Sequence, residues 1–229
     1  MRILFLADIN SAHTRKWAVA LSEKGFEIGV FSLSRSDRDW YSKHTISVFS
    51  GDVGKKKFSS ASFSKLTYLK SVPTVKKIIK EFAPDILHAH YATSYGLIGA
   101  RTGFHPYIIS AWGSDVMEFP GKSIVHKLAL KGILSKEDRL FATRQTIKTS
   151  IHSLVEKEVV ITPFGVDTAA FKPMKPGPGP DGDQLVIGTI KSLEKVYCID
   201  VLISAFAELR KNNPNLHLLI VGEGSQKEE

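Results

Sequence analysis

Short apolar runs alternate along most of the chain with segments in which apolar residues recur every three or four positions. The run at 3–7, for example, precedes a helical pattern from about 13 to 24 that ends at Gly25. Short apolar runs are typical of strands, and the longer repeat is typical of a helix with one buried face. The pattern predicts strands at 3–7, 26–33, 45–49, 84–89, 106–111, 139–142 and 159–162, and further helices near 64–82, 93–102, 123–134 and 144–154.

The order of these elements indicates the fold class. Strands that alternate with helices favour right-handed crossovers and a parallel sheet covered on both faces. The apolar runs are continuous rather than alternating, as in strands that are buried on both sides. We therefore predict a doubly wound α/β domain with a parallel, Rossmann-like sheet.

The composition of the sequence changes after Phe171. Residues 172–183 contain four prolines and three glycines, a composition that excludes a helix or a central strand. A strand at 185–190, a helix at 199–211 and a strand at 216–221 follow and form one βαβ unit. We divide the chain into a Rossmann-like domain over 1–171, a linker over 172–184 and the start of a second Rossmann-like domain over 185–229. Because so short a unit does not close a core of its own, we expect the sequence to stop inside the second domain.

The composition indicates an ordinary globular protein, with 43% hydrophobic and 24% charged residues. No apolar run approaches the ~18 residues that a membrane-spanning helix needs, and the N-terminus has no signal-peptide cleavage pattern. The single cysteine, Cys198, excludes an internal disulfide and fits a reducing compartment. We expect a cytoplasmic protein.

The formal net charge of +8 is concentrated in one stretch. Residues 55–80 contain eight lysines and no acid, so the rest of the chain is balanced. Apolar residues also recur here every three or four positions, and Pro73 predicts a kink or two short helices. One hypothesis is contact with anionic lipid at the inner face of the membrane, through Lys55, Lys56, Lys57, Phe58, Lys65 and Lys70. The alternative is a helix with a hydrated lysine face. Nucleic acid is not expected, since no aromatic stacking platform or groove-reading motif is present.

Four groups of short motifs occur along the chain in a characteristic order. They are 1–8 with 13–18 and 21–25; 84–90 with 110–115; 161–167, which includes Phe164-Gly165-Val166-Asp167, with Phe171 and Pro173; and 187–189 with 194–195, 199–206 and 219–224. Each alone is common. Together they resemble the retaining glycosyltransferases of family 4, which combine two Rossmann-like domains in the GT-B fold. The resemblance covers nearly the whole chain and implies that this sequence is the first domain and part of the second.

The resemblance implies a donor site in the second domain, where the diphosphate of a nucleotide sugar must be stabilised as it departs. Lys195 corresponds to the family's phosphate-binding lysine, against the alternative of a solvated loop lysine. Thr189 stands where the family usually has arginine, and Lys191 is a substitute for that charge. Gly222, Glu223 and Gly224 form either a donor-contacting turn or a plain turn. The loop is also two residues longer than usual, and Cys198 replaces a common glycine.

The resemblance places the acceptor and the cleft at the carboxyl edge of the first sheet. Its residues are Asn10, His13 and Thr14 after the first strand, His90 after the fourth, Trp112, Gly113 and Asp115 after the fifth, and Gly165 at the domain crossover. Trp112 stands where many relatives carry histidine; it has no acid–base chemistry, but it stacks on sugar rings or walls a pocket. Asp115 either binds substrate hydroxyls or caps the next turn. Asn10 acts as a ligand or as a helix cap, and Gly165 has a structural role or borders the cleft.

His88 and His90 lie two apart on a predicted strand, so both side chains face one way. A metal site needs further ligands at suitable spacing, which this sequence lacks, so we expect no metal. His90, nearer the end of the strand, is expected to border the cleft, and His88 to be a core residue. The only small-molecule partner implied is the nucleotide sugar, as a co-substrate and not a cofactor.

The sequence therefore predicts a glycosyltransferase that moves a sugar from a nucleoside-diphosphate sugar to a polysaccharide or lipid-linked acceptor. Because relatives carry a pair of glutamates further along the second domain, we expect no transfer by these 229 residues alone. Two alternatives stay open: a non-catalytic fragment that binds acceptor or membrane, and a related two-domain enzyme such as a sugar-nucleotide epimerase or a phosphorylase.

Overall fold

The computed structural model describes residues 1–34, 38–50, 68–173 and 184–228. The chain divides into two compact units, Met1–Gly165 and Val166–Glu229. Each unit is described by itself.

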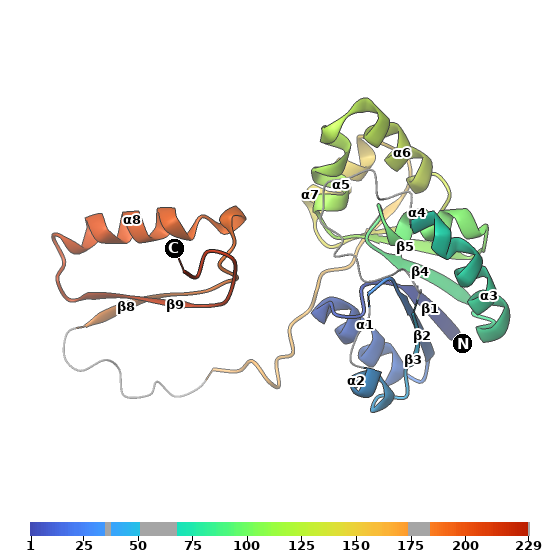
Figure 1. The fold of residues 1–229 in the computed structure, drawn as a ribbon, viewed down its shortest axis with the longest axis horizontal. Coiled ribbons are helices and arrows are strands. Elements are labelled where there is room, and N and C mark those ends of the chain that lie inside the picture. Colours follow the sequence, from blue (N-terminus) through green and yellow to red (C-terminus); the bar gives the residue numbers. More distant parts are fainter. Residues whose placement is uncertain (35–37, 51–67, 174–183, 229) are drawn as a thin grey trace. The chain divides into compact units, whose positions relative to one another are not determined.

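The N-terminal unit is built on a parallel sheet of seven strands in the order β3-β2-β1-β4-β5-β6-β7 (Figure 1). Its strands are β1 (Arg2–Leu6), β2 (Glu27–Ser32), β3 (Ser47–Ser50), β4 (Ile86–His90), β5 (Tyr107–Ala111), β6 (Arg139–Ala142) and β7 (Val159–Ile161). All of its strand pairs are parallel. The doubly wound α/β prediction is confirmed, and each predicted strand of this unit lies within a few residues of an observed one.

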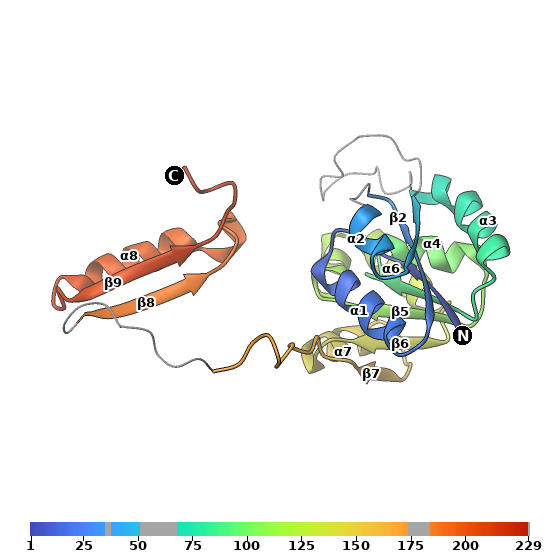
Figure 2. The same cartoon turned by 90° about the horizontal axis from the view of Figure 1, so that it is seen from below.

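Helices cover both faces of this sheet (Figures 1 and 2). They are α1 (Ala12–Ser22), α2 (Arg38–Ser42), α3 (Val72–Phe82), α4 (Tyr95–Thr102), α5 (Ser114–Met117), the 3-10 helix η2 (Phe119–Lys122), α6 (Ile124–Leu134) and α7 (Gln145–His152). Successive side chains of a strand point to opposite faces. Ile3 and Phe5 accordingly pack in the core under α1 and α2, while Leu4 and Leu6 pack in the core under α3, α4, α6 and α7.

The helix predicted near 64–82 differs from the observed one. Residues 51–67 lie outside the described part of the chain; a 3-10 turn at 68–71 leads into α3. Pro73 stands in the first turn of α3, and no kink is needed. Because the first-turn N–H groups of a helix have no partner within the helix, proline is tolerated there.

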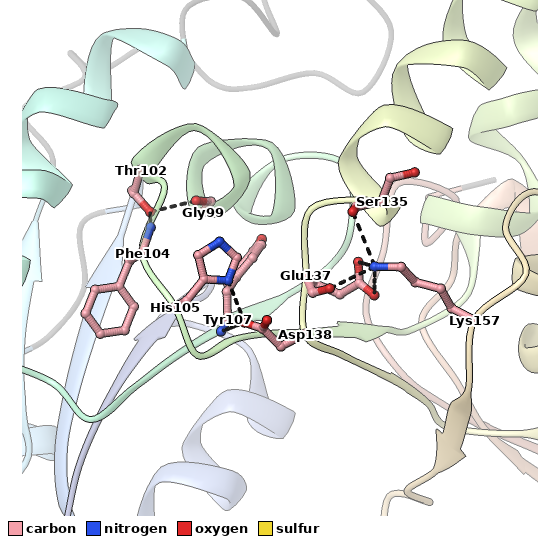
Figure 3. A network of polar contacts seen from close by, with 9 residues as sticks. All are labelled: Gly99, Thr102, Phe104, His105, Tyr107, Ser135, Glu137, Asp138 and Lys157. Atoms are coloured by element: carbon pink, nitrogen blue, oxygen red, sulfur yellow. Dashed lines mark hydrogen bonds and ion pairs between the residues drawn. The ribbon is translucent and has the colours of Figure 1, made fainter.

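Polar networks lie where β5, β6 and β7 begin, at the amino edge of the sheet (Figure 3). Glu137 is buried, and its carboxylate accepts hydrogen bonds from the Lys157 ammonium at 3.0 and 3.2 Å. Asp138 accepts from the backbone N–H of Tyr107 at 2.6 Å and from Nδ1 of His105 at 2.7 Å. These contacts anchor the edge opposite the one where α/β sheets bind ligands.

The second unit contains the predicted βαβ arrangement. Strands β8 (Leu185–Ile190) and β9 (Leu216–Val221) pair in parallel, joined by the 3-10 helix η3 (Lys195–Tyr197) and helix α8 (Ile199–Arg210). The division between units falls after Gly165, six residues before the predicted end of the first domain at 171. Most of the predicted linker, 174–183, lies outside the described residues.

Candidate functional site

A cavity of about 350 Å³ opens at the carboxyl edge of the N-terminal sheet. From β1 the chain winds one way to β2 and β3, and from β4 it winds the other way through β5 to β7. Ligands of doubly wound proteins bind at such a switch point. Residues from both sides line the cavity: Asp8, Ser11, Leu33, Ser34, Tyr68, His90, Tyr91, Ser94, Tyr95 and Trp112.

His90, the last residue of β4, is the most unusual polar group of this site. It is 1% exposed, and neither ring nitrogen has a hydrogen-bond partner among the described residues. The rings of Phe5, His88 and Trp112 surround it, with centroids 4.7, 4.7 and 5.0 Å away. Burial, and then the neighbouring His88 and His13, lower the pKa of His90 well below its usual value. His90 is therefore a neutral imidazole with unused hydrogen-bonding capacity beside a cavity.

His88 has its own partner, as expected of a core residue. Its Nε2 lies 2.8 Å from Oγ of Ser110, and burial lowers its pKa to about 3. The two histidines share one face of β4, and among the described residues no group of three or more histidines, cysteines and carboxylates is arranged to hold a metal ion.

Three aromatic rings from distant parts of the sequence form a wall at the same edge. His13 at the start of α1 stacks on Phe164, with centroids 3.7 Å apart and 7° between the planes. Trp112, which follows β5, meets both rings edge-on at 5.5 and 5.4 Å. Burial and the charge of Lys16 lower the pKa of His13. Trp112 thus lines the cavity. His13 contacts Trp112 but is not itself a lining residue.

Asp115 is a positioning residue in this structure, and its predicted contact with substrate hydroxyls stays a prediction. The side chain is fully buried. Its Oδ2 accepts from the backbone N–H of Ala92 at 2.7 Å, and its Oδ1 accepts from Gly113 at 2.8 Å and Trp112 at 3.2 Å. Burial raises the pKa of Asp115, against the effect of these hydrogen bonds. The carboxylate joins the segments after β4 and β5.

Two residues in the segments that Asp115 joins have left-handed backbones. Gly113 has φ of 150°, a conformation that side chains rarely adopt. Tyr91 has φ of 81°, and its hydroxyl lies 2.6 Å from Oγ of Ser114. A strained non-glycine backbone costs of order 1 kcal/mol and is common at binding sites.

Three other residues predicted for the first-domain site lie outside the cavity lining. Thr14 is fully buried, and its hydroxyl has no hydrogen-bond partner within the part of the chain that the structure describes. Asn10 is exposed, and its backbone N–H donates to Asp8. Gly165 accepts a hydrogen bond from the Lys16 ammonium through its carbonyl oxygen, which supports the structural role. None of the three lines the cavity.

Several residues that line the cavity were not predicted from the sequence. Asp8 directly follows β1, and Tyr91 directly follows β4; a polar residue at the carboxyl end of a parallel strand is the signal that marks them. Tyr95 and Tyr68 come from helical segments and reach the cavity through packing, so no local pattern identifies them.

The predicted donor residues lie in the loops around β8 and β9. Lys195 begins η3 and is exposed, and the Lys191 ammonium lies 4.1 Å from the centre of the Tyr197 ring. Thr189 is on β8. Added Cβ atoms on Gly222 and Gly224 would collide with the backbone of Lys191 and Leu193. Glycine at these positions therefore allows the loop after β8 to pack closely against the turn after β9. Glu223 pairs with Lys227 at 2.7 Å.

The predicted membrane contacts Lys55, Lys56, Lys57, Phe58 and Lys65 lie outside the described residues. Lys70 is exposed in the turn before α3. The exposed face of α3 carries Lys76, Lys77 and Lys80, while Val75, Ile78 and Phe82 are buried in the core. On the described part of the stretch, the lysines are thus exposed, which fits both alternatives. No helix of the described ranges is long and apolar enough to cross a membrane.

Two protein families match the sequence. The family described as "Glycosyl transferase 4-like" matches residues 2–144, and "Glycosyl transferases group 1" matches residues 171–229. No curated protein matches the chain.

Solved structures share the fold at low sequence identity. Sucrose-phosphate synthase from Thermosynechococcus elongatus is 17% identical, with a TM-score of 0.76 over 100% of this chain and 64% of its own. HepE from Anabaena, in complex with UDP and glucose, is 16% identical, with a TM-score of 0.67 over 98% of this chain and 61% of its own. UDP-GlcNAc 2-epimerase from Neisseria meningitidis, bound to UDP-GlcNAc, is 14% identical, with a TM-score of 0.60 over 96% of this chain and 65% of its own. The chain therefore spans less than two thirds of each of these structures.

Proposed function

Because the chain belongs to the glycosyl transferase 4-like family, we propose that its protein transfers a hexose from a nucleoside-diphosphate sugar to a saccharide or lipid-linked acceptor. The family resemblance implies retention of the anomeric configuration and a role in surface polysaccharide or lipopolysaccharide assembly. The observation that carries the proposal is the cavity at the switch point of the sheet, with the unpartnered His90 on its wall.

The cavity has the chemistry of a sugar site. Trp112, Tyr91 and Tyr95 supply aromatic rings for the apolar side of a pyranose, while Ser34 and Ser94 supply hydroxyls. The volume of about 350 Å³ is at the small end of the range for ligand sites. We therefore assign it the terminal sugar of an acceptor and not a long oligosaccharide.

His90 fits a sugar hydroxyl better than a charged group. Because its pKa is lowered, the ring is neutral and has one donor and one acceptor nitrogen. A hydroxyl both donates and accepts, so it satisfies either nitrogen. An anion would find no positive charge on this ring. For the same reason His90 binds and orients, and we assign it no proton transfer.

Asp8 is the carboxylate of the described cavity wall. It is exposed, and one of its oxygens accepts from the backbone N–H of Asn10 at 3.0 Å. We assign its other oxygen to the hydroxyl of the acceptor. A carboxylate that accepts this hydrogen bond orients the attacking oxygen and attracts its proton, which makes that oxygen more nucleophilic.

The second unit supplies the cations that the departing diphosphate requires. Lys195 and Lys191 lie in the loop between β8 and α8, at the carboxyl end of β8. Positive charges and helix N-terminal N–H groups stabilise a diphosphate. We assign these lysines, with Thr189 and the Gly222-Glu223-Gly224 turn, to the nucleotide sugar. With protein cations in this role, we propose no metal or other cofactor.

Ligand-observed nuclear magnetic resonance tests the acceptor site. Saturation transfer from the protein to simple hexosides is expected for the wild type and reduced about tenfold or more in His90→Gln and Trp112→Ala. His152→Gln, a surface histidine on α7, is the matched control and is expected to behave as the wild type. Equal transfer in all four proteins would place saccharide binding elsewhere.

A further inference from the structure

The solvent-facing side of α6 is apolar. Ile124, Val125 and Leu128 are 67%, 68% and 61% exposed, more than any other large apolar residue described in the N-terminal unit. The helix is anchored in the core by Leu130, Ile133 and Leu134. It therefore has two apolar faces: one packs on the sheet, and the other is presented to solvent.

Lysines surround this exposed apolar surface. Lys122, Lys127, Lys131 and Lys136 are all exposed. No acidic residue occurs between Glu118 and Glu137. An exposed apolar stripe with a rim rich in cations is typical of a helix that lies at a membrane surface, since it offers insertion and charge attraction together.

We propose that α6 docks the N-terminal unit onto an anionic lipid surface, with Ile124, Val125 and Leu128 inserted among the headgroups and the four lysines on the lipid phosphates. A second copy of the chain fits this surface less well. In a two-fold interface the same patch meets itself, so the lysines of one copy would face those of the other, and the segment from 119 to 136 has no acid to neutralise them.

The neighbouring α3 adds charge without insertion. Helices α3 and α6 both contact α4 and cover the same face of the sheet. The exposed lysines of α3 stand over apolar residues that are already in the core. Electrostatic attraction extends over about a Debye length, roughly 10 Å at moderate salt. We therefore assign α3 to electrostatic attraction of the protein to the lipid surface, and α6 to insertion into it.

The position of α6 connects this surface with the cavity. The helix follows β5 through α5 and η2, so its first turn lies toward the carboxyl edge of the sheet, where the cavity opens. A membrane contact here brings that edge toward lipid, which suits a lipid-linked acceptor. This connection rests on the proposed function, whereas the membrane contact does not.

Vesicle co-sedimentation tests the contact without any sugar. The wild type is expected to bind vesicles of phosphatidylcholine with phosphatidylglycerol, and to bind phosphatidylcholine alone weakly. Ile124→Gln/Leu128→Gln is expected to weaken binding by about tenfold or more. Val201→Gln/Ile203→Gln, a pair with similar exposure on α8, is the matched control and is expected to bind as the wild type.

The lysines are tested in the same assay. Lys127→Gln/Lys131→Gln is expected to weaken binding by about fivefold for each charge removed and to reduce its dependence on salt. The α3 variant Lys76→Gln/Lys80→Gln is expected to have a smaller effect. Circular dichroism checks that each variant is folded.

A fluorescence readout locates the inserted residue. Cys198, an exposed free cysteine, is first replaced by serine. A polarity-sensitive dye on Leu128→Cys is then expected to shift to the blue with anionic vesicles, and the same dye on Val201→Cys is not. Three results would overturn the proposal: wild-type protein that does not bind, Ile124→Gln/Leu128→Gln that binds normally, or a wild-type dimer that this variant converts to monomer.

Discussion

The imidazole of His13 lies flat on the ring of Phe164, with 3.7 Å between centroids and 7° between planes. The two residues are far apart in the sequence, and Trp112 from a third segment meets both. The Lys16 ammonium bonds the carbonyl of Gly165 next to this stack. The start of α1 is thus tied to the segment after β7, and the aromatic wall beside the cavity depends on both.

Removal of Phe164 is expected to loosen this wall. Phe164→Ala should lower the free energy of unfolding by about 1 kcal/mol, the usual value of a stacked aromatic pair, and shift the tryptophan emission to the red as Trp112 gains solvent. Phe171→Ala, at a residue that is 76% exposed, should change neither. Urea unfolding followed by fluorescence measures both quantities. Identical curves for the two variants would show that the stack holds nothing in place.

Replacement of the buried Asp115 is expected to be costly. Asp115→Asn presents an amide NH₂ to backbone N–H donors, so at least one buried donor loses its acceptor. The expected loss is about 2–4 kcal/mol in the free energy of unfolding. Asp85→Asn is the control, because Asp85 is exposed and accepts from one backbone N–H, that of Arg2 at 2.7 Å. If Asp115→Asn were as stable as Asp85→Asn, the positioning role of Asp115 would be wrong.

The buried histidines predict a sensitivity to mild acid. Because burial lowers the pKa of His88 to about 3 from 6.5, the unfolded chain takes up a proton first as the pH falls below 6.5. Stability is then lost by on the order of 1 kcal/mol for each pH unit below 6.5, and His90 adds an effect of the same sign. Asp115 and Glu137, whose pKa values are raised by burial, act in the opposite direction near pH 4.

The variant His88→Gln isolates this effect. Glutamine retains a hydrogen-bonding group for Ser110 but does not titrate. Its urea midpoint should fall less than that of the wild type between about pH 7 and pH 5.5. Parallel pH profiles for the two proteins would mean that folding does not lower the pKa of His88.

Cys198 is expected to be a suboptimal residue for its backbone. It precedes α8 with φ of 49°, a left-handed conformation that costs side-chain-bearing residues about 1 kcal/mol. Cys198→Gly should therefore stabilise the start of α8, by about 0.5 kcal/mol after the greater freedom of the unfolded chain is considered. Native-state hydrogen exchange of the first α8 amides measures the gain, and Cys198→Ala should show none. Faster exchange in the glycine variant would contradict this account.

Much of the fold follows from local pattern, and the site follows from it only in part. Strands such as β1 and β4 are continuous apolar runs, so the number of strands and their parallel direction were predictable. His90 and Trp112 were found because they end such strands. The backbone partners of Asp115 were not predictable, since Ala92 belongs to another loop and three backbone donors cannot be read from one sequence position. The exposed stripe of α6 was also hidden, because apolar residues on both faces of a helix look alike in sequence.

The central claim is sugar transfer, and analysis of the products from activated sugars tests it most directly. The protein expressed from its complete reading frame is incubated with a panel of labelled nucleoside-diphosphate sugars and with saccharide and lipid acceptors. The account predicts a labelled glycoside from at least one donor, reduced about tenfold or more in His90→Gln and Lys195→Ala and unchanged in His152→Gln. Recovery of an epimerised nucleotide sugar without any glycoside would contradict it.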